Sequence, residues 1–390
     1  MQLQQRAADR CEPYIAAIRR LAPTIEAARD RVEHERLMPA ELLDSLYAEG
    51  LLSLWLARAC GGPELSATDF IRVIEAISAL DGSIGWCTCI GAGYARLSGF
   101  LSEEVARRIF SGRRPVLAGT IAPTGTARRV EGGWRVTGRW AFGSGIRHCT
   151  WVLGLCTEDT AAPPAAGMNP LRVALFPVEQ ATIIDTWDVM GLRGTGSHDY
   201  TVEDLFVPDE YTIPGLAEYP TQPGPLYAMP LPSIFVIAIT SVMLGIARGA
   251  LDHFAVLAGT KRVMYSGGLL RDRAVVHDAV GRAEASLRAA RAFLLEVADM
   301  IWTIAGEGGT PTLQQRALVR LACCQVNVTS SAAARTVFEL MGGSGVYAAA
   351  GLERRVRDIQ TAGQHVALHS VYFEHAGRVM LGLDPGASRF

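Results

Sequence analysis

The stretch "RRVEGGWRVTGRWAFGSG", residues 128–145, decides how the chain is organised. Apolar and polar residues alternate on both sides of Glu131-Gly132-Gly133, which is the pattern of a β-hairpin closed by a glycine-containing turn. Further β-rich runs follow at 150–158, 171–179 and 181–208. The pattern predicts a small β domain over residues 113–222.

Helical patterns lie on both sides of this segment. Residues 4–112 carry apolar residues three and four apart, with Ser66 or Thr68 as a candidate N-cap and a break and restart at Asp81-Gly82-Ser83. After the proline-rich linker 219–232, long helices are expected at 233–258, 272–306, 312–341 and 353–382. The chain is therefore predicted to be α+β and mostly α, with an N-terminal helical domain (1–112), the β domain, and a C-terminal four-helix bundle (223–390).

Composition limits the class of partner. The 390 residues are 49% hydrophobic, and 37 basic residues nearly balance 39 acidic ones, so neither nucleic acid nor a membrane surface is favoured. The charge-free apolar run 233–247 is too short to span a bilayer, and the N-terminus does not resemble a secretory signal. We expect a cytoplasmic protein that binds a small neutral or amphipathic ligand.

Several familiar chemistries are disfavoured by the motifs. The glycine clusters at 191–199 and 341–347 complete neither a P-loop nor a G-x-G-x-x-G fingerprint, and "GGSGV" follows a helix where a serine-hydrolase elbow would follow a strand. His365 and His369 could share a helical face and ligate a metal, but no third ligand is placed by spacing. The pattern favours one histidine facing a pocket and the other packing or being solvated.

Small residues mark two candidate ligand contacts. Ser144 stands between two glycines at an expected strand end, and "GTGS" at 194–197 is similar. Each is either a simple turn or a place where a planar ligand approaches the backbone and hydrogen-bonds a hydroxyl.

Five motifs resemble the acyl-CoA dehydrogenase superfamily over nearly the whole chain. They are "DGSIGWC" (81–87), "IAPTGTARRVEGGWRVTGRWAFGSG" (121–145), "GLRGTGSHDYTVEDLFVP" (191–208), "ELMGGSGVY" (339–347) and "RDIQTAGQHVALH" (357–369). The resemblance implies a β-barrel-like middle domain, with a flavin held between it and the C-terminal bundle. It also implies a homotetramer in which the neighbouring subunit completes the site.

The acid expected of a dehydrogenase is missing. Such an enzyme needs a carboxylate base against the flavin, and in most members it lies nine residues after the Arg of the R-D motif. Counting from Arg357 gives Val366, and the alternative position, between Asp252 and Asp272, contains no Asp or Glu.

With His365 beside the vacant position, the chain resembles the flavin-dependent monooxygenase branch. That branch implies reduced FMN or FAD delivered by a separate NAD(P)H-dependent flavin reductase, addition of O2 at flavin C4a, and transfer of the distal oxygen to substrate. Carried onto this sequence, Ser144 would hydrogen-bond flavin N5 and His365 the peroxide region. The implied flavin pocket and contacts are Trp140, Phe142, Gly145, Arg193, Thr195, Ser197, Lys261, Arg262, Gly342, Gly343 and Ser344; the implied substrate contacts are Trp86, Tyr94, His365 and His369.

The presence of Tyr94 favours an indole slightly as the expected substrate. Several phenol hydroxylases of the branch carry a His at the position that Tyr94 occupies here. Without that base, an electron-rich heteroaromatic is favoured slightly over a phenol. Three alternatives remain open: an acyl-CoA dehydrogenase with its base elsewhere, an N- or S-oxygenase of the same branch, and a flavin-free scaffold.

Overall fold

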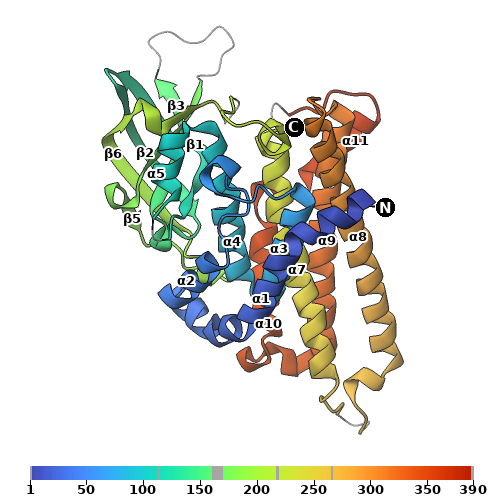
Figure 1. Cartoon of the computed structure of the whole chain (residues 1–390). Coiled ribbons are helices and arrows are strands. Elements are labelled where there is room, and N and C mark those ends of the chain that lie inside the picture. The colour runs from blue at the N-terminus through green and yellow to red at the C-terminus, as the bar shows by residue number, and fades with distance from the viewer. Residues whose placement is uncertain (1, 113, 160–169, 217–218, 265–266, 388–390) are drawn as a thin grey trace.

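The structure is a computed structural model that describes residues 2–112, 114–159, 170–216, 219–264 and 267–387. Figure 1 shows an open sheet on one side and a layer of long helices on the other. Helix α4 (Gly82–Tyr94) contacts both β1 of the sheet and α7 of the helical layer. Almost every residue of α4 is buried, so this helix joins the two layers.

The N-terminal helices follow the expected pattern. Ser66 Oγ accepts the Asp69 N–H at 3.1 Å and caps α3, while Asp81 caps α4 by accepting the Ile84 N–H at 2.9 Å. These caps confirm Ser66 over Thr68 as the N-cap of α3, and confirm the break at 81–83. The remaining elements are α1 (Gln2–Glu35), α2 (Ala40–Ala48), α3 (Ala67–Leu80), α5 (Glu103–Phe110), and the 3-10 turns η1 (Arg58–Cys60) and η2 (Ala95–Phe100).

The middle segment forms one seven-stranded sheet in the order β5-β6-β2-β1-β3-β4-β7. The predicted hairpin is confirmed, because Val130 pairs with Gly133 across a turn in which Gly132 has φ +74°. The barrel-like form is wrong: a barrel requires its edge strands to pair, and the edges here, β5 and β7, are three residues long and leave the sheet open. The strands are β1 (Leu117–Val130), β2 (Gly133–Gly143), β3 (Trp151–Asp159), β4 (Leu171–Pro177), β5 (Thr182–Ile184), β6 (His198–Pro208) and β7 (Thr212–Pro214).

Trp140 is a sheet-core residue. A Cβ on Gly125, Gly138 or Gly154 would lie 2.2, 2.7 or 2.6 Å from atoms of its ring, so three glycines on three strands make the space that the indole fills. The ring stacks on Tyr200 at 5.3 Å and is fully enclosed. The packing of Trp140 is thus explained by the sheet core, and its expected contribution to a flavin pocket stays a prediction.

Three of the four expected C-terminal helices are confirmed to within two residues, as α7 (Leu231–Ala258), α8 (Ala274–Gly306) and α9 (Leu313–Met341). The fourth is wrong as a single helix, because α10 (Leu352–Gly363) ends before His365 and α11 (Val371–Met380) begins after it. His365 Nδ1 accepts the Ala367 N–H at 3.1 Å, which replaces a helical hydrogen bond and starts the 3-10 turn η10 (Val366–Leu368). The other short elements are α6 (Pro225–Ala228), η3 (Ile146–His148), η4 (Val178–Gln180), η5 (Arg193–Thr195), η6 (Asp209–Tyr211), η7 (Leu270–Asp272), η8 (Gly342–Val346) and η9 (Ala348–Ala350).

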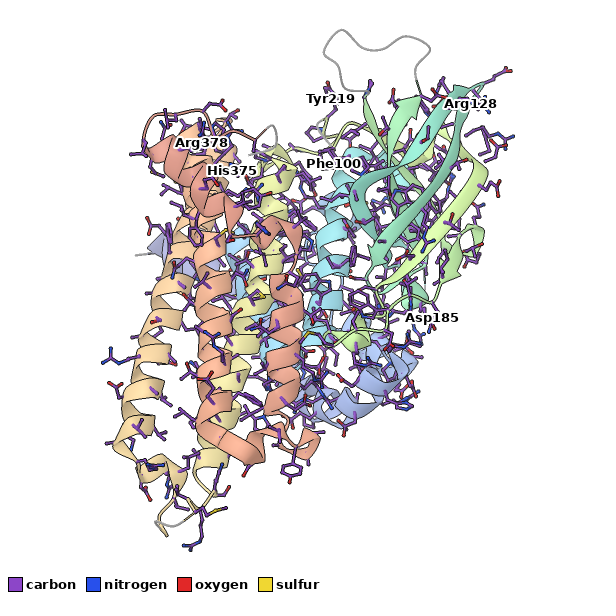
Figure 2. All side chains as sticks on the ribbon, turned by 180° about the vertical axis from the view of Figure 1, so that it is seen from behind. Phe100, Arg128, Asp185, Tyr219, His375 and Arg378 are labelled. Atoms are coloured by element: carbon purple, nitrogen blue, oxygen red, sulfur yellow. The ribbon has the colours of Figure 1, made fainter. Side chains whose placement is uncertain are left out.

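Helix α7 is the central helix of the C-terminal layer. It is long and apolar enough to cross a membrane, yet 89% of its most apolar window is buried by α3, α4 and the neighbouring C-terminal helices. Such burial is what the sequence predicts for this run, a core helix. Figure 2 shows Phe100, at the end of η2, between the sheet and this helical layer, and His375 and Arg378 of α11 at the end of the molecule away from Asp185.

Candidate active site

Trp86, Ser144 and His365 meet although they come from three distant parts of the chain. Trp86 lies on α4, Ser144 follows β2, and His365 lies between α10 and α11. The Trp86 indole N–H donates to Ser144 Oγ at 3.0 Å, and the centres of the Trp86 and His365 rings are 6.0 Å apart. The structure thus gathers both predicted catalytic residues around one predicted substrate contact.

His365 is held as a neutral hydrogen-bond donor. Because Nδ1 accepts the Ala367 N–H, the ring proton belongs on Nε2. Burial lowers the pKa of the imidazole to about 4, so the ring carries no charge at neutral pH. Its other aromatic neighbour is Phe235 of α7, 5.7 Å away between ring centres. The sequence did not single out Phe235, because it lies in a run where nearly every residue is apolar.

A chain of buried hydroxyls extends from Ser144. Ser144 Oγ lies 2.8 Å from Ser197 Oγ, which lies 2.7 Å from Thr195 Oγ1, and Thr195 donates to the Leu192 carbonyl at 2.8 Å. The Gly145 N–H donates to the Thr195 carbonyl at 2.8 Å and ties the two turns together. Thr195 and Ser197, expected as further flavin contacts, are joined to Ser144 by this chain of hydroxyls, and their contact with flavin stays a prediction.

Phe142 and Gly145 flank Ser144 at the end of β2; Phe142 is exposed and Gly145 is buried. Phe142 is 66% exposed, has φ +64° and meets Trp187 edge-on at 6.1 Å. Gly145 has φ +75°, a conformation that favours glycine, and a Cβ there would lie 2.7 Å from the His148 ring, which already fills the space beside this turn. Arg193 points elsewhere, because its guanidinium donates to Asp188 and to the Val189 carbonyl, so its contact with flavin stays a prediction.

The predicted phosphate contacts gather at the other end of α7. Lys261 donates to the carbonyl of Met341, the last residue of α9. Arg262 is exposed. The glycine-rich segment that follows Met341 is also exposed; it comprises Gly342, Gly343 and Ser344. Phe235 is near the start of α7 and Lys261 just beyond its end, roughly 40 Å away at the rise of an α-helix, so the two clusters occupy opposite ends of this helix (Figure 1).

The two other expected substrate contacts, Tyr94 and His369, each form a hydrogen bond to the backbone. The Tyr94 hydroxyl donates to the Gly119 carbonyl at 3.1 Å, and burial raises the pKa of the phenol. His369 is exposed, and its Nδ1 accepts the Val371 N–H at 3.1 Å at the start of α11. Both side chains are explained by local structure. Nδ1 of His365 and Nδ1 of His369 each accept a backbone N–H, and no cluster of three potential metal ligands occurs among the described residues.

Comparison with known proteins identifies the family. The family model "Acyl-CoA dehydrogenase, C-terminal domain" matches residues 237–370. The chain is 31% identical over 368 residues to indole-3-acetate monooxygenase of Pseudomonas putida, covering 93% of each chain. It is 28% identical over 399 residues to the oxygenase component of an FADH(2)-dependent resorcinol hydroxylase of a Rhizobium species, covering 96% of each. The chain belongs to the flavin-dependent monooxygenases of the acyl-CoA dehydrogenase superfamily.

The fold of this flavin-dependent monooxygenase is also that of XiaF from a Streptomyces species, solved in complex with FADH2 and glycerol. The TM-score is 0.90 at 24% identity, with 99% of each chain covered. At that identity the likeness establishes the fold alone.

In this monooxygenase the buried carboxyl of Asp358 holds Leu192, the residue whose carbonyl ends the chain of hydroxyls. Asp358 Oδ1 accepts the Leu192 N–H at 2.6 Å, so Leu192 is held at its N–H by Asp358 and at its carbonyl by Thr195. Asp358 also lines a cavity of about 270 Å³ between α1, α7 and α10. Burial and the nearby Asp81 raise the pKa of Asp358 to about 8. Asp358 belongs to the R-D motif, but sequence reasoning assigned it no role.

Replacing Asp358 with asparagine is expected to stabilise the protein at high pH. The pKa of this carboxyl is higher in the folded than in the unfolded chain, so the stability that it contributes is present below about pH 4 and lost as pH rises toward 8. Asparagine keeps an oxygen for the Leu192 N–H and cannot ionise. In thermal unfolding, the Tm advantage of Asp358→Asn should grow from pH 5 to pH 9. Exposed Asp299→Asn on α8 is the control, and a constant difference across this range would contradict the assignment.

Proposed function

We propose that this chain is the oxygenase component of a two-component monooxygenase. It accepts reduced flavin from a separate NAD(P)H-dependent reductase and inserts one atom of O2 into a small aromatic substrate. The observation that carries the proposal is the contact of neutral His365 with Trp86, which is bonded to Ser144. Val366, at the position expected for a dehydrogenase base, is 74% exposed and apolar.

The residues around Ser144 fit a flavin. The Ser144 hydroxyl oxygen offers one polar contact, and the exposed ring of Phe142 offers a flat surface for a planar ring. The bound reduced flavin would supply the electrons that activate O2. His365 would hold a proton at Nε2 and donate it as a hydrogen bond toward the reacting oxygen without bringing a charge into the pocket. Trp86 and Phe235 would exclude water from that side.

An indolic substrate is the one we favour. Relatives are named for indole-3-acetate and for a phenol, resorcinol. The Tyr94 hydroxyl is committed to the Gly119 carbonyl and its pKa is raised, so it is not available as the base that would form a phenolate. An indole needs no such deprotonation. N- or S-oxygenation of a similarly sized compound is the alternative within the same chemistry.

The deciding experiment supplies the protein with a flavin reductase, NADH and FAD or FMN, and then with indole-3-acetate or phenol. We expect substrate-dependent O2 consumption and a product heavier by one oxygen, with indole-3-acetate preferred. In parallel, oxidised flavoprotein is mixed anaerobically with acyl-CoA thioesters. Bleaching of the flavin by a thioester, or no oxygenated product from any indole, phenol, thiophene or amine tested, would refute the proposal. Failure to bind reduced flavin would instead favour the scaffold.

Tyr94→Phe is expected to lower the stability of the protein without stopping the hydroxylation reaction. Losing its hydrogen bond to Gly119 should lower the free energy of unfolding by about 1 kcal/mol. Hydroxylation of indole-3-acetate should continue, because the hydroxyl does not reach the substrate in this proposal. Denaturant unfolding and a product assay measure the two effects. A large loss of product at unchanged stability would place Tyr94 in the active site after all.

The assembly and the compartment belong to the same proposal. Exposed Gly342, Gly343 and Ser344 beside Lys261 would contact the flavin phosphates of a neighbouring subunit in a homotetramer. Their separation from Ser144 along α7 supports this, because one flavin cannot span both clusters of one chain. The proposal also divides the chain into three domains at 112/113 and 222/223, with the C-terminal helices as a bundle. It places the protein in the cytoplasm.

A further inference from the structure

The hydroxyl chain at Ser144 has only one possible direction. Its first group, the Trp86 indole N–H, can only donate, and its last, the Leu192 carbonyl, can only accept. Thr195 has one proton and gives it to Leu192, so Ser197 must donate to Thr195. The single proton of Ser197 is then used, so Ser144 must donate to Ser197.

What remains on Ser144 Oγ is therefore a lone pair. The oxygen accepts one hydrogen bond from Trp86 and donates its only proton to Ser197. A hydroxyl can accept two hydrogen bonds, so one acceptor position stays open. The open position offers no proton to a ligand. It can bind a group that brings its own hydrogen, and it disfavours a group that is itself only an acceptor.

We infer that Thr195 and Ser197 are positioning residues that make Ser144 select reduced over oxidised flavin. The inference rests on the proposed function, in which Ser144 faces flavin N5. Reduced flavin carries a hydrogen on N5 and can donate to the open lone pair. Oxidised flavin has only a lone pair on N5, which would face the lone pair of Ser144. Discrimination of this kind, between a matched and an unmatched buried polar group, is stronger than shape alone provides.

Leu192, at the end of the chain of hydroxyls, is held firmly enough to fix the direction of the hydrogen bonds. Leu192 has φ +52°, and its carbonyl also accepts the Trp187 indole N–H at 3.0 Å, while its N–H is bound by Asp358. Ser144, Thr195 and Ser197 are all buried, so water does not compete for their protons. Reversing the chain of hydroxyls would leave the Thr195 hydroxyl oxygen and the Leu192 carbonyl oxygen 2.8 Å apart with no proton between them.

The test measures binding of oxidised FAD and of dithionite-reduced FAD, both anaerobically, to wild type, Thr195→Val and Ser197→Ala. Valine keeps the shape of threonine but removes the acceptor, so Ser197 can turn its proton to Ser144 and free the Ser144 proton for N5. Either variant should lower the ratio of the oxidised to the reduced Kd about tenfold. The midpoint potential of bound FAD should fall by about 30 mV, which is the same factor for a two-electron couple.

Two control variants test whether the change in the Kd ratio comes from the chain of hydroxyls. Thr195→Ser retains a hydroxyl and should keep the wild-type ratio. Thr201→Val removes a threonine hydroxyl from β6, where it donates to the Gly138 carbonyl at 2.8 Å, and should leave the ratio unchanged. If Ser197→Ala does not fold, the shape-matched Thr195→Val decides.

The outcomes separate this inference from the proposed function. The inference alone is overturned if wild type prefers reduced FAD and oxygenates substrate, but Thr195→Val and Ser197→Ala leave the ratio of the two Kd values unchanged. Wild type that binds oxidised FAD as tightly as reduced FAD also overturns it. Wild type that binds neither form overturns the proposed function itself.

Discussion

His365→Ala is expected to lower product formation about a hundredfold while flavin binding is largely kept. The variant removes the neutral Nε2–H donor that faces Trp86 and Phe235. Loss of one preorganised catalytic hydrogen bond commonly costs roughly 2–4 kcal/mol of transition-state stabilisation, which corresponds to a factor of this size. Reduced flavin would still react with O2, so O2 consumption should continue with release of H2O2 in place of product.

His365→Asn is the matched variant that isolates the imidazole. Asparagine is a good capping residue and can still accept the Ala367 N–H, so the turn at η10 should survive. If loss of the cap caused the defect in His365→Ala, the asparagine variant would restore product. If the imidazole is required, both variants should fail alike, whereas exposed His277→Ala on α8 should match wild type. Wild-type coupling of O2 to product in both His365 variants would show that the oxygen site lies elsewhere.

The order of helices, sheet and helices was predictable because its signals are local. The turn at Gly132 lies inside the alternating run that it connects, and Ser66 and Asp81 cap helices that start within three residues of them. Ser144 and His365 could be singled out for a different reason, the resemblance of their motifs. Their meeting around Trp86 is tertiary, yet those motifs together named all three residues.

The features that were missed depend on groups distant in the sequence or on competition between backbone and side chain. Residues 364–370 keep apolar positions at helical spacing, but the His365 ring binds a backbone N–H and ends the helix. Trp140 is buried by glycines from three strands, whose register only the folded sheet reveals. Phe235 stands in a run of uniform hydrophobicity, and the contact of Asp358 with Leu192 joins segments that no pattern in the chain relates.

Ser144→Ala is expected to lose product and stability together, for two distinguishable reasons. Loss of the hydroxyl removes the proposed contact to flavin N5, so most of the O2 consumed should appear as H2O2, with product lower by about a hundredfold. The same change leaves the buried Trp86 N–H without its acceptor and removes the hydrogen bond that Ser197 accepts. An unsatisfied buried donor costs roughly 1–3 kcal/mol, so the midpoint of unfolding should fall as well.

Ser98→Ala separates these two effects. Ser98 is an equally buried serine on η2 that accepts the Ala57 N–H and donates to the Ala95 carbonyl, so its loss also removes one hydroxyl and two hydrogen bonds. The two alanine variants should lose similar stability in thermal unfolding. Peroxide and product assays should then differ, because only Ser144 touches the proposed flavin site. Equal release of H2O2 by both variants would mean that general loosening of the fold causes the uncoupling, and Ser144 would lose its place at the flavin.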